Sequence, residues 1–230
     1  ARPESAERHL SAMLVLLATE GPQPDGLTNA AQQLLSHWRR PLSLSTGTLA
    51  DRLPQTKLVP LLGFRHFYVS DLAVFRAPEF YASVRMFSER TIDYEALHGA
   101  NETGWFLGYG LTYITRTGDE LYRDPATLGE HFDWDRPPGT TTRVGVRPDD
   151  SKHRGESRLS GGAGCPPAEG QHHGGVCGFI LKPVTGDFTA RKSVHFFERG
   201  LVALGSDITS SKRHPGQPIV TTVLQWAAPE

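Results

Sequence analysis

Residues 80–87 read FYASVRMF, and this stretch decides the fold. Ala82, Val84 and Met86 occupy one set of alternate positions, and the other set is Tyr81, Ser83, Arg85 and Phe87. Successive side chains of a β-strand point to opposite faces of the sheet, so a period of two marks a strand. The stretch therefore predicts a β-strand with these two sets of side chains on its two faces.

More strands are expected on both sides of this one. The first, residues 61–75, is rich in aromatic and β-branched residues, and clusters of Gly, Pro, Asp and Asn separate the strands. They are residues 61–75, 105–114, 178–184, 193–197, 201–204 and 219–224. Many short strands without helices between them predict antiparallel sheets that form a sandwich or a barrel.

Before Pro41 the apolar residues follow a helical period instead. In residues 7–19 they recur at i, i+3, i+4 and i+7, and a second helix is expected from the N-cap Thr28 to Pro41. A single helical hairpin is too small to form a domain, so it resembles the end of something larger. We therefore divide the chain into residues 1–40, the last helices of a helical domain, and residues 41–230, an antiparallel β-sandwich domain.

The composition limits the classes of protein and partner that the sequence allows. The chain has 230 residues, of which 38% are hydrophobic, enough for a substantial core. With 24 basic and 25 acidic residues, the charge gives no reason to expect nucleic acid or an acidic membrane surface as a partner. No apolar run approaches the roughly 20 residues of a membrane-spanning helix.

Residues 148–175 are polar and rich in glycine, which predicts a long loop. The two cysteines, Cys165 and Cys177, lie in and just after it. We predict that they form a disulfide that closes the loop, which would suit an oxidising, extracellular setting. The alternative is two free thiols.

The side chains best able to take part in catalysis or binding are clustered in residues 89–105, ERTIDYEALHGANETGW. This expected loop combines carboxylates, an imidazole, an amide, a phenol and an indole, which can transfer protons and bind or stack on a sugar. The alternative is an ordinary solvated loop. Glu130, His131, Asp133 and Asp135 could be metal ligands, but alternate aspartates also fit a solvated strand edge, and we predict no metal and no cofactor.

Three motifs in order resemble one family, the polysaccharide lyases that include hyaluronate lyase, chondroitin AC and ABC lyases and xanthan lyase. The first runs from RMFSERT at residues 85–91 to NETGWFLGYG at 101–110. The second is HFDWDRPPGTT at 131–141, and the third is FTARKS at 188–193 followed by LVALGSDI at 201–208.

The resemblance implies an N-terminal α/α toroid followed by a large antiparallel β-sandwich. It also implies cleavage of uronic-acid-containing anionic polysaccharides by β-elimination, in which a base removes the C5 proton of the uronate and the C4 oxygen leaves. In the family an Asn, a His and a Tyr of the toroid do this chemistry, so this chain alone would lack the main catalytic groups. The implied partners are the substrate and the toroid part of the same polypeptide, and the implied location is outside the cell.

By motif position, Glu95 corresponds to the family's sandwich-domain glutamate, which supports the catalytic Tyr through an Arg. His98 stands where the family often has Asn, and Arg2 resembles the end of the toroid's Arg-containing segment. We assign these three to catalysis, and Asn101, Trp105 and Arg90 to substrate binding.

Two other functions remain open from sequence. The chain could be a non-catalytic carbohydrate-binding β-sandwich module, or, more remotely, a metal-dependent sandwich enzyme that uses its His and Asp residues.

Overall fold

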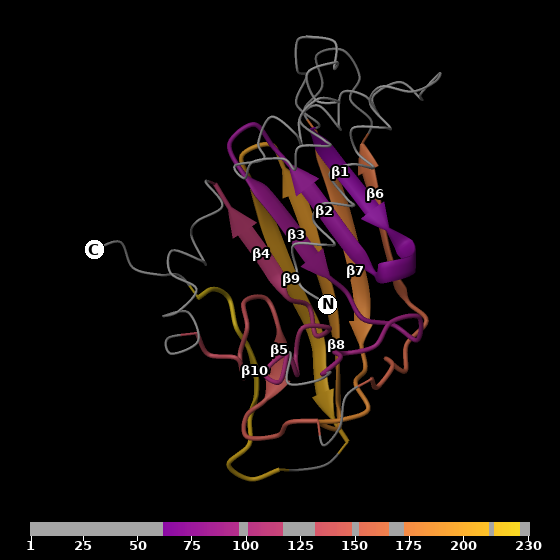
Figure 1. The fold of residues 1–230 in the computed structure, drawn as a ribbon, viewed down its shortest axis with the longest axis vertical. Helices are drawn as coiled ribbons and strands as arrows, with labels where there is room; N and C mark the ends of the chain where they lie inside the picture. The colour runs from indigo at the N-terminus through magenta and orange to yellow at the C-terminus, as the bar shows by residue number, and fades with distance from the viewer. Residues whose placement is uncertain are drawn as a thin grey trace, which may run out of the picture. The chain divides into compact units, whose positions relative to one another are not determined.

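The computed structural model describes residues 62–96, 101–116, 132–148, 152–165, 173–211 and 214–225 (Figure 1). These residues form ten strands and one short 3-10 turn, η1 (Tyr68–Ser70). The strands are β1 (Gly63–Phe67), β2 (Leu72–Arg76), β3 (Tyr81–Arg85), β4 (Thr112–Thr115), β5 (Thr141–Arg143), β6 (Ser160–Cys165), β7 (Gly174–Leu181), β8 (Phe188–Phe197), β9 (Gly200–Ser210) and β10 (Ile219–Thr221). The expected helical hairpin and the expected boundary at residue 41 lie outside the described residues.

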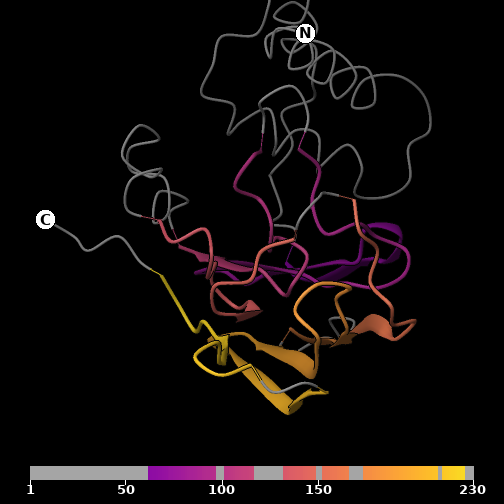
Figure 2. The ribbon, with the colours of Figure 1, turned by 90° about the horizontal axis from the view of Figure 1, so that it is seen from below.

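The strands form two antiparallel four-stranded sheets, in the orders β1-β2-β3-β4 and β6-β7-β8-β9, together with a short β10-β5 pair. Figure 2 shows the two larger sheets as separate layers, β1–β4 in purple and β6–β9 in orange to yellow. The prediction of a mainly β, antiparallel sandwich is therefore confirmed. No helix in the described part of the chain is long and apolar enough to cross a membrane.

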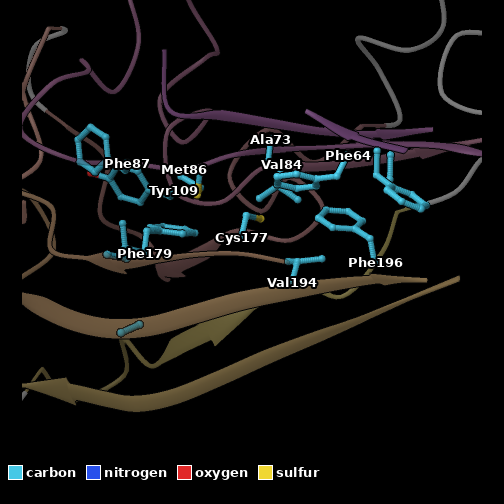
Figure 3. Packing of buried hydrophobic residues seen from close by; sticks show 14 of the residues in the cluster. Phe64, Ala73, Val84, Met86, Phe87, Tyr109, Cys177, Phe179, Val194 and Phe196 are labelled. Carbon is cyan, nitrogen blue, oxygen red and sulfur yellow. The ribbon is translucent and has the colours of Figure 1, made fainter. Parts of the chain in front are cut away.

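The core lies between these layers and receives aromatic side chains from both (Figure 3). The ring of Phe196 on β8 stacks on Phe75 of β2 at a centroid distance of 5.3 Å and contacts Phe64 of β1 at 5.7 Å. Ala82, Val84 and Met86, which the alternation of residues 80–87 puts on one face, are all buried. Phe87 was placed on the opposite face, but it follows the end of β3, where the chain leaves the strand, and it too is buried.

The prediction of a long loop over residues 148–175 is wrong, because it contains all of β6 and the start of β7. The glycines there permit close packing. A Cβ atom added to Gly162, Gly164 or Gly175 would lie 2.8, 2.9 or 2.5 Å from the side chain of Phe64. Phe64 thus packs directly on the backbone of the β6–β7 hairpin, where a side chain would displace it.

The expected strand at residues 105–114 is shorter than predicted, since only Thr112–Thr115 pairs with β3. Residues 105–110 form consecutive turns, in which Leu107 N donates to Gly104 O and Tyr109 N donates to Phe106 O. Phe106 and Tyr109, which favoured a strand here, are buried in turns, where tertiary packing outweighs strand propensity.

The predicted disulfide is also wrong, because both cysteines are free. In the β6–β7 register Cys177 lies opposite Gly162 and Cys165 lies opposite Gly174. The three-residue offset amounts to about 10 Å along a strand and places the two side chains on opposite faces, whereas a disulfide needs Cα atoms within about 7 Å. Cys165 is exposed, while Cys177 lies in the core, where burial raises the pKa of its thiol to about 12.

Lys192 of β8 connects the second sheet to the turns beside the first. Its Nζ donates to Gly139 O and, over 2.9 Å, to Thr141 Oγ1, and it lies 2.9 Å from where a Cβ of Gly110 would be. Burial of the ammonium lowers the pKa of Lys192 to about 7. Lys192 therefore links the two layers through hydrogen bonds of its side-chain nitrogen, and burial disfavours the charged form of that nitrogen.

The contact between Phe64 and the glycines can be tested with Gly175→Ala. The added methyl group would overlap the Phe64 ring, so we expect a loss of about 1–3 kcal/mol in the free energy of unfolding, as overpacked cores show. Gly161→Ala is the matched control, since its Cβ would meet no atom within 4 Å. Urea denaturation of both variants measures the difference, and equal stabilities would contradict the packing account.

Lys192→Met tests the buried ammonium through the pH dependence of stability. Between the folded pKa of about 7 and the unfolded value of about 10.4, the unfolded chain binds the proton that the folded chain has released. Stability should therefore rise with pH in this window. From pH 7 to 8.5 the wild type should gain stability relative to Lys192→Met by up to about 1.4 kcal/mol per pH unit. A pH-independent difference between the two proteins would refute this.

Candidate functional site

The candidate site is the connection between β3 and β4, described at residues 86–96 and 101–111. It starts where β3 ends, beside the start of β2 and the start of β6, because Arg85 pairs with Leu72. These neighbours hold the first part of the connection to the sandwich. The rest can then present polar groups away from the core.

A buried carboxylate, Asp71, fixes the first turn of the connection. It accepts hydrogen bonds from Ser88 Oγ at 2.5 Å, Thr91 Oγ1 at 2.9 Å and Ser160 Oγ at 2.9 Å, and it forms an ion pair with Arg90. Burial acts to raise the pKa of Asp71, but these four hydrogen-bond donors outweigh it and hold the pKa below its ordinary value. Asp71 therefore ties β2, the connection and β6 together as a satisfied anion.

Arg90, assigned to substrate binding, has a second role in the structure. Besides pairing with Asp71, its guanidinium donates to Tyr68 O at 3.2 Å and to Ser160 O at 3.3 Å. Its side chain remains 36% exposed, but its charge neutralises Asp71. A substrate contact by Arg90 stays a prediction.

The structure brings Glu95 and Asn101 together. Asn101 Nδ2 donates to the main-chain oxygen of Glu95 over 3.0 Å, and Asn101 adopts a left-handed φ of 58° that Asn tolerates well. The Glu95 carboxylate is about half exposed and forms an ion pair with Lys152 Nζ at 3.0 Å. Glu95 is thus an accessible anion on a backbone held from two sides. His98 and Arg2 lie outside the described residues.

A second buried carboxylate, Asp93, lies two residues before Glu95. Its Oδ2 is 3.3 Å from His153 Nδ1, and its Oδ1 accepts a hydrogen bond from Tyr94 N at 2.7 Å. Burial raises the pKa of Asp93, although the bond from Tyr94 and the neighbouring His153 act in the opposite direction. Buried Tyr109 lies close by, and burial, with Asp93 as a further cause, raises the pKa of its phenol.

Trp105, predicted to stack on a sugar ring, already has a cation on one face. The guanidinium carbon of Arg147 lies 4.2 Å from the centre of the indole, and Arg147 makes two hydrogen bonds to Asp135, at 2.6 and 2.7 Å. An indole has two faces, so a sugar could use at most the other one. Stacking of a sugar on Trp105 stays a prediction.

The structure gives no support to a metal site among the described residues, where no group of three potential ligands occurs. Asp133 accepts from Arg136 at 2.7 Å, and Asp135 is paired with Arg147. Glu130 and His131 lie outside the described residues. The two aspartates thus behave as members of surface ion pairs.

Sequence reasoning missed Lys152, His153 and Arg147, which contact the predicted residues from distant parts of the chain. Lys152 and His153 lie within the stretch expected to be a loop, 57 residues after Glu95 and 60 residues after Asp93, respectively. Their only signal is a short basic run, KHR at residues 152–154. The pairing of that run with residues 92–94 could not be derived from local pattern.

The fold and these motifs define the class of the protein. Residues 62–228 match the family model described as polysaccharide lyase family 8, super-sandwich domain. The match covers well over half of the chain, so the chain belongs to this family, and the resemblance inferred from the three motifs is confirmed.

The chain is also similar in sequence to individual polysaccharide lyases. The chain is 32% identical over 164 residues to a xanthan lyase from Bacillus sp. (strain GL1), a match that covers 70% of this chain and 16% of that protein. It is 28% identical over 183 residues to chondroitinase-AC from Pedobacter heparinus, covering 76% of this chain and 24% of that protein. The chain thus spans a quarter or less of the length of these relatives.

Solved structures share the fold. Paenibacillus xanthan lyase superimposes with a TM-score of 0.68 at 26% identity, covering 91% of this chain and 20% of that chain. Streptomyces coelicolor A3 chondroitin AC lyase, solved in complex with chondroitin sulphate, gives a TM-score of 0.69 over 94% of this chain and 30% of that chain. Its 24% identity is evidence for the fold alone.

The role of Asp71 is tested by Asp71→Asn, which keeps the size but leaves Arg90 without its counter-charge. Arg90 is partly exposed, so the main loss is of the hydrogen bonds to the buried charge, and a loss of about 1.5–3 kcal/mol in the free energy of unfolding is expected. Asp207→Asn is a close control, because Asp207 has the same φ of 50° and an ion pair with Arg191, but is exposed. That variant should change stability by less than about 1 kcal/mol. Similar losses in both variants would argue against a special role for Asp71.

Proposed function

We propose that this chain is the sandwich portion of a lyase that cleaves uronic-acid-containing anionic polysaccharides by β-elimination. The observation that carries the proposal is the family match, which runs through the β3–β4 connection where Glu95 lies. The names of two relatives, xanthan lyase and chondroitinase-AC, support this substrate class.

β-Elimination makes three chemical demands. The uronate carboxylate must be neutralised so that the C5 proton becomes acidic, a base must remove that proton, and the C4 oxygen must receive one as it leaves. We propose that the helical part of the same polypeptide supplies these groups. The sandwich part would orient them.

Glu95 suits such an orienting role. Its carboxylate is accessible, and its backbone is held by Asn101, so it can accept paired hydrogen bonds from an arginine. Lys152 is its present partner and would be exchanged for, or shared with, that arginine. A fixed arginine would in turn hold the catalytic tyrosine, as the family resemblance implies.

We also propose that the protein acts outside the cell. A polysaccharide of many charged sugars does not cross a membrane, so an enzyme that starts its degradation must meet it in the extracellular space. This proposal rests on the substrate class alone, since the two cysteines do not form the disulfide that would have supported it.

Glu95→Gln in the full-length enzyme tests the proposal. The substitution keeps the shape but removes the charge, so kcat should fall by about tenfold or more while KM changes less, because a misplaced catalytic group mainly harms the transition state. The assay follows absorbance of the unsaturated uronate with xanthan, chondroitin sulfates and hyaluronan.

Glu89→Gln is the control, since the Glu89 carboxylate forms an exposed ion pair with Arg158. Wild-type kinetics of Glu95→Gln would remove the loop from the active site. Binding of a polysaccharide without turnover by the wild-type protein would favour a carbohydrate-binding module instead.

A further inference from the structure

The backbone of residues 152–154 pairs with that of residues 92–94, the segment just before Glu95. Asp93 N donates to His153 O at 2.8 Å, and Lys152 N donates to Tyr94 O at 3.0 Å. Ile92 and Arg154 form an antiparallel bridge beside them. This short ladder joins two stretches that are about 60 residues apart in the sequence.

A side-chain contact between His153 and Asp93 reinforces the ladder. Asp93 is 1% exposed, whereas the His153 ring, 3.3 Å from its carboxylate, is 32% exposed. A carboxylate next to Nδ1 favours the imidazole tautomer or ion that carries a proton on Nδ1. The ring is thus anchored at its inner nitrogen by a buried acceptor.

The groups around this pair hold the same stretch of backbone. From β3, Arg85 Nη2 donates to Ile92 O at 2.9 Å and approaches Asp93 O at 3.5 Å. From the turns at residues 105–110, Gly108 packs so closely that its Cβ would lie 3.1 Å from the Cα of Asp93. Asp93 therefore has little freedom, and His153 is fixed relative to it.

The ladder ends at the candidate functional group. Glu95 follows Asp93 by two residues, and its ion-pair partner Lys152 is the residue before His153. The His153–Asp93 contact thus holds both sides of the Glu95–Lys152 pair. If His153 released Asp93, residues 152–154 would keep the hydrogen bonds of Arg154 Nη1 to Glu89 O and Arg90 O. They would lose the side-chain contact next to Glu95 and Lys152, so the Glu95 backbone and its cation could shift.

We propose that His153 is a positioning residue for Glu95, which it holds in place by donating a hydrogen bond from Nδ1 to the buried carboxylate of Asp93. The proposal rests on the proposed function of Glu95 and adds to it the residue that sets the position of that carboxylate. His153 itself need not contact the substrate.

Two substitutions of His153 distinguish the effect of its hydrogen-bond donor at Nδ1 from any other effect of the imidazole ring. His153→Ala removes the hydrogen bond to Asp93, whereas His153→Asn places an amide N–H close to the position of Nδ1 and keeps the donor. In the full-length enzyme, His153→Ala should lower kcat by about 10- to 100-fold, the loss that a displacement of about 1 Å can cause, with KM changed much less. His153→Asn should restore kcat to within about threefold of wild type, because one good hydrogen bond is enough to hold the geometry.

Controls make each outcome decisive. Arg191→Ala removes an exposed ion pair with Asp207, on the other sheet and away from Glu95, and should leave both kinetic constants unchanged. Thermal unfolding of the 230-residue variants reports whether His153→Ala folds; if it does not, the comparison of His153→Asn with wild type decides. A loss of kcat in His153→Asn as large as in His153→Ala would overturn the proposal, since it would mean that the imidazole acts by itself.

The kinetics of two variants distinguish a failure of the His153 proposal from a failure of the function proposed for Glu95. If Glu95→Gln lowers kcat and His153→Ala does not, Glu95 keeps its role and the positioning role of His153 is wrong. If neither variant lowers kcat, the active-site role of the whole connection is wrong.

Discussion

The site depends on the hydrogen bonds and the ion pair that the buried Asp71 carboxylate makes next to the start of β2. An isolated carboxylate in this position would be strongly unfavourable, so its four donors from Ser88, Arg90, Thr91 and Ser160 must remain in place. Three of them belong to the start of the β3–β4 connection and one to β6. Satisfying a single charge thus fixes where the connection leaves the sandwich.

The same end of the sandwich contains two buried carboxylates with different surroundings. Asp71 is surrounded by donors, which lower its pKa, whereas burial raises the pKa of Asp93, which has Tyr94 N and His153 as partners. The first arrangement suits a permanent structural anion. The second, with a partly exposed histidine, places a polar pair next to Glu95, where a small change in geometry would reach the candidate catalytic group.

The sequence predicts the strands well where they face a core on one side, as at Ala82, Val84 and Met86. It fails where glycine serves packing, because local pattern cannot distinguish a glycine under Phe64 from one in a loop, and β6 is missed for this reason. The disulfide fails for a related reason, since the register of the β6–β7 hairpin is set by the whole sheet. At the site, Glu95 and Asn101 come from a local motif, but Lys152 and His153 reach them through long-range pairing that no local motif encodes.

The most direct test of the central claim, that this sandwich orients catalytic groups of a polysaccharide lyase through Glu95, is a crystal structure of the full-length protein with a bound uronate oligosaccharide. The account predicts that the Glu95 carboxylate accepts hydrogen bonds from an arginine of the helical part, at about 2.7–2.9 Å, with that arginine beside the reacting sugar. It would be contradicted if Glu95 faced solvent, paired only with Lys152, while the oligosaccharide bound elsewhere.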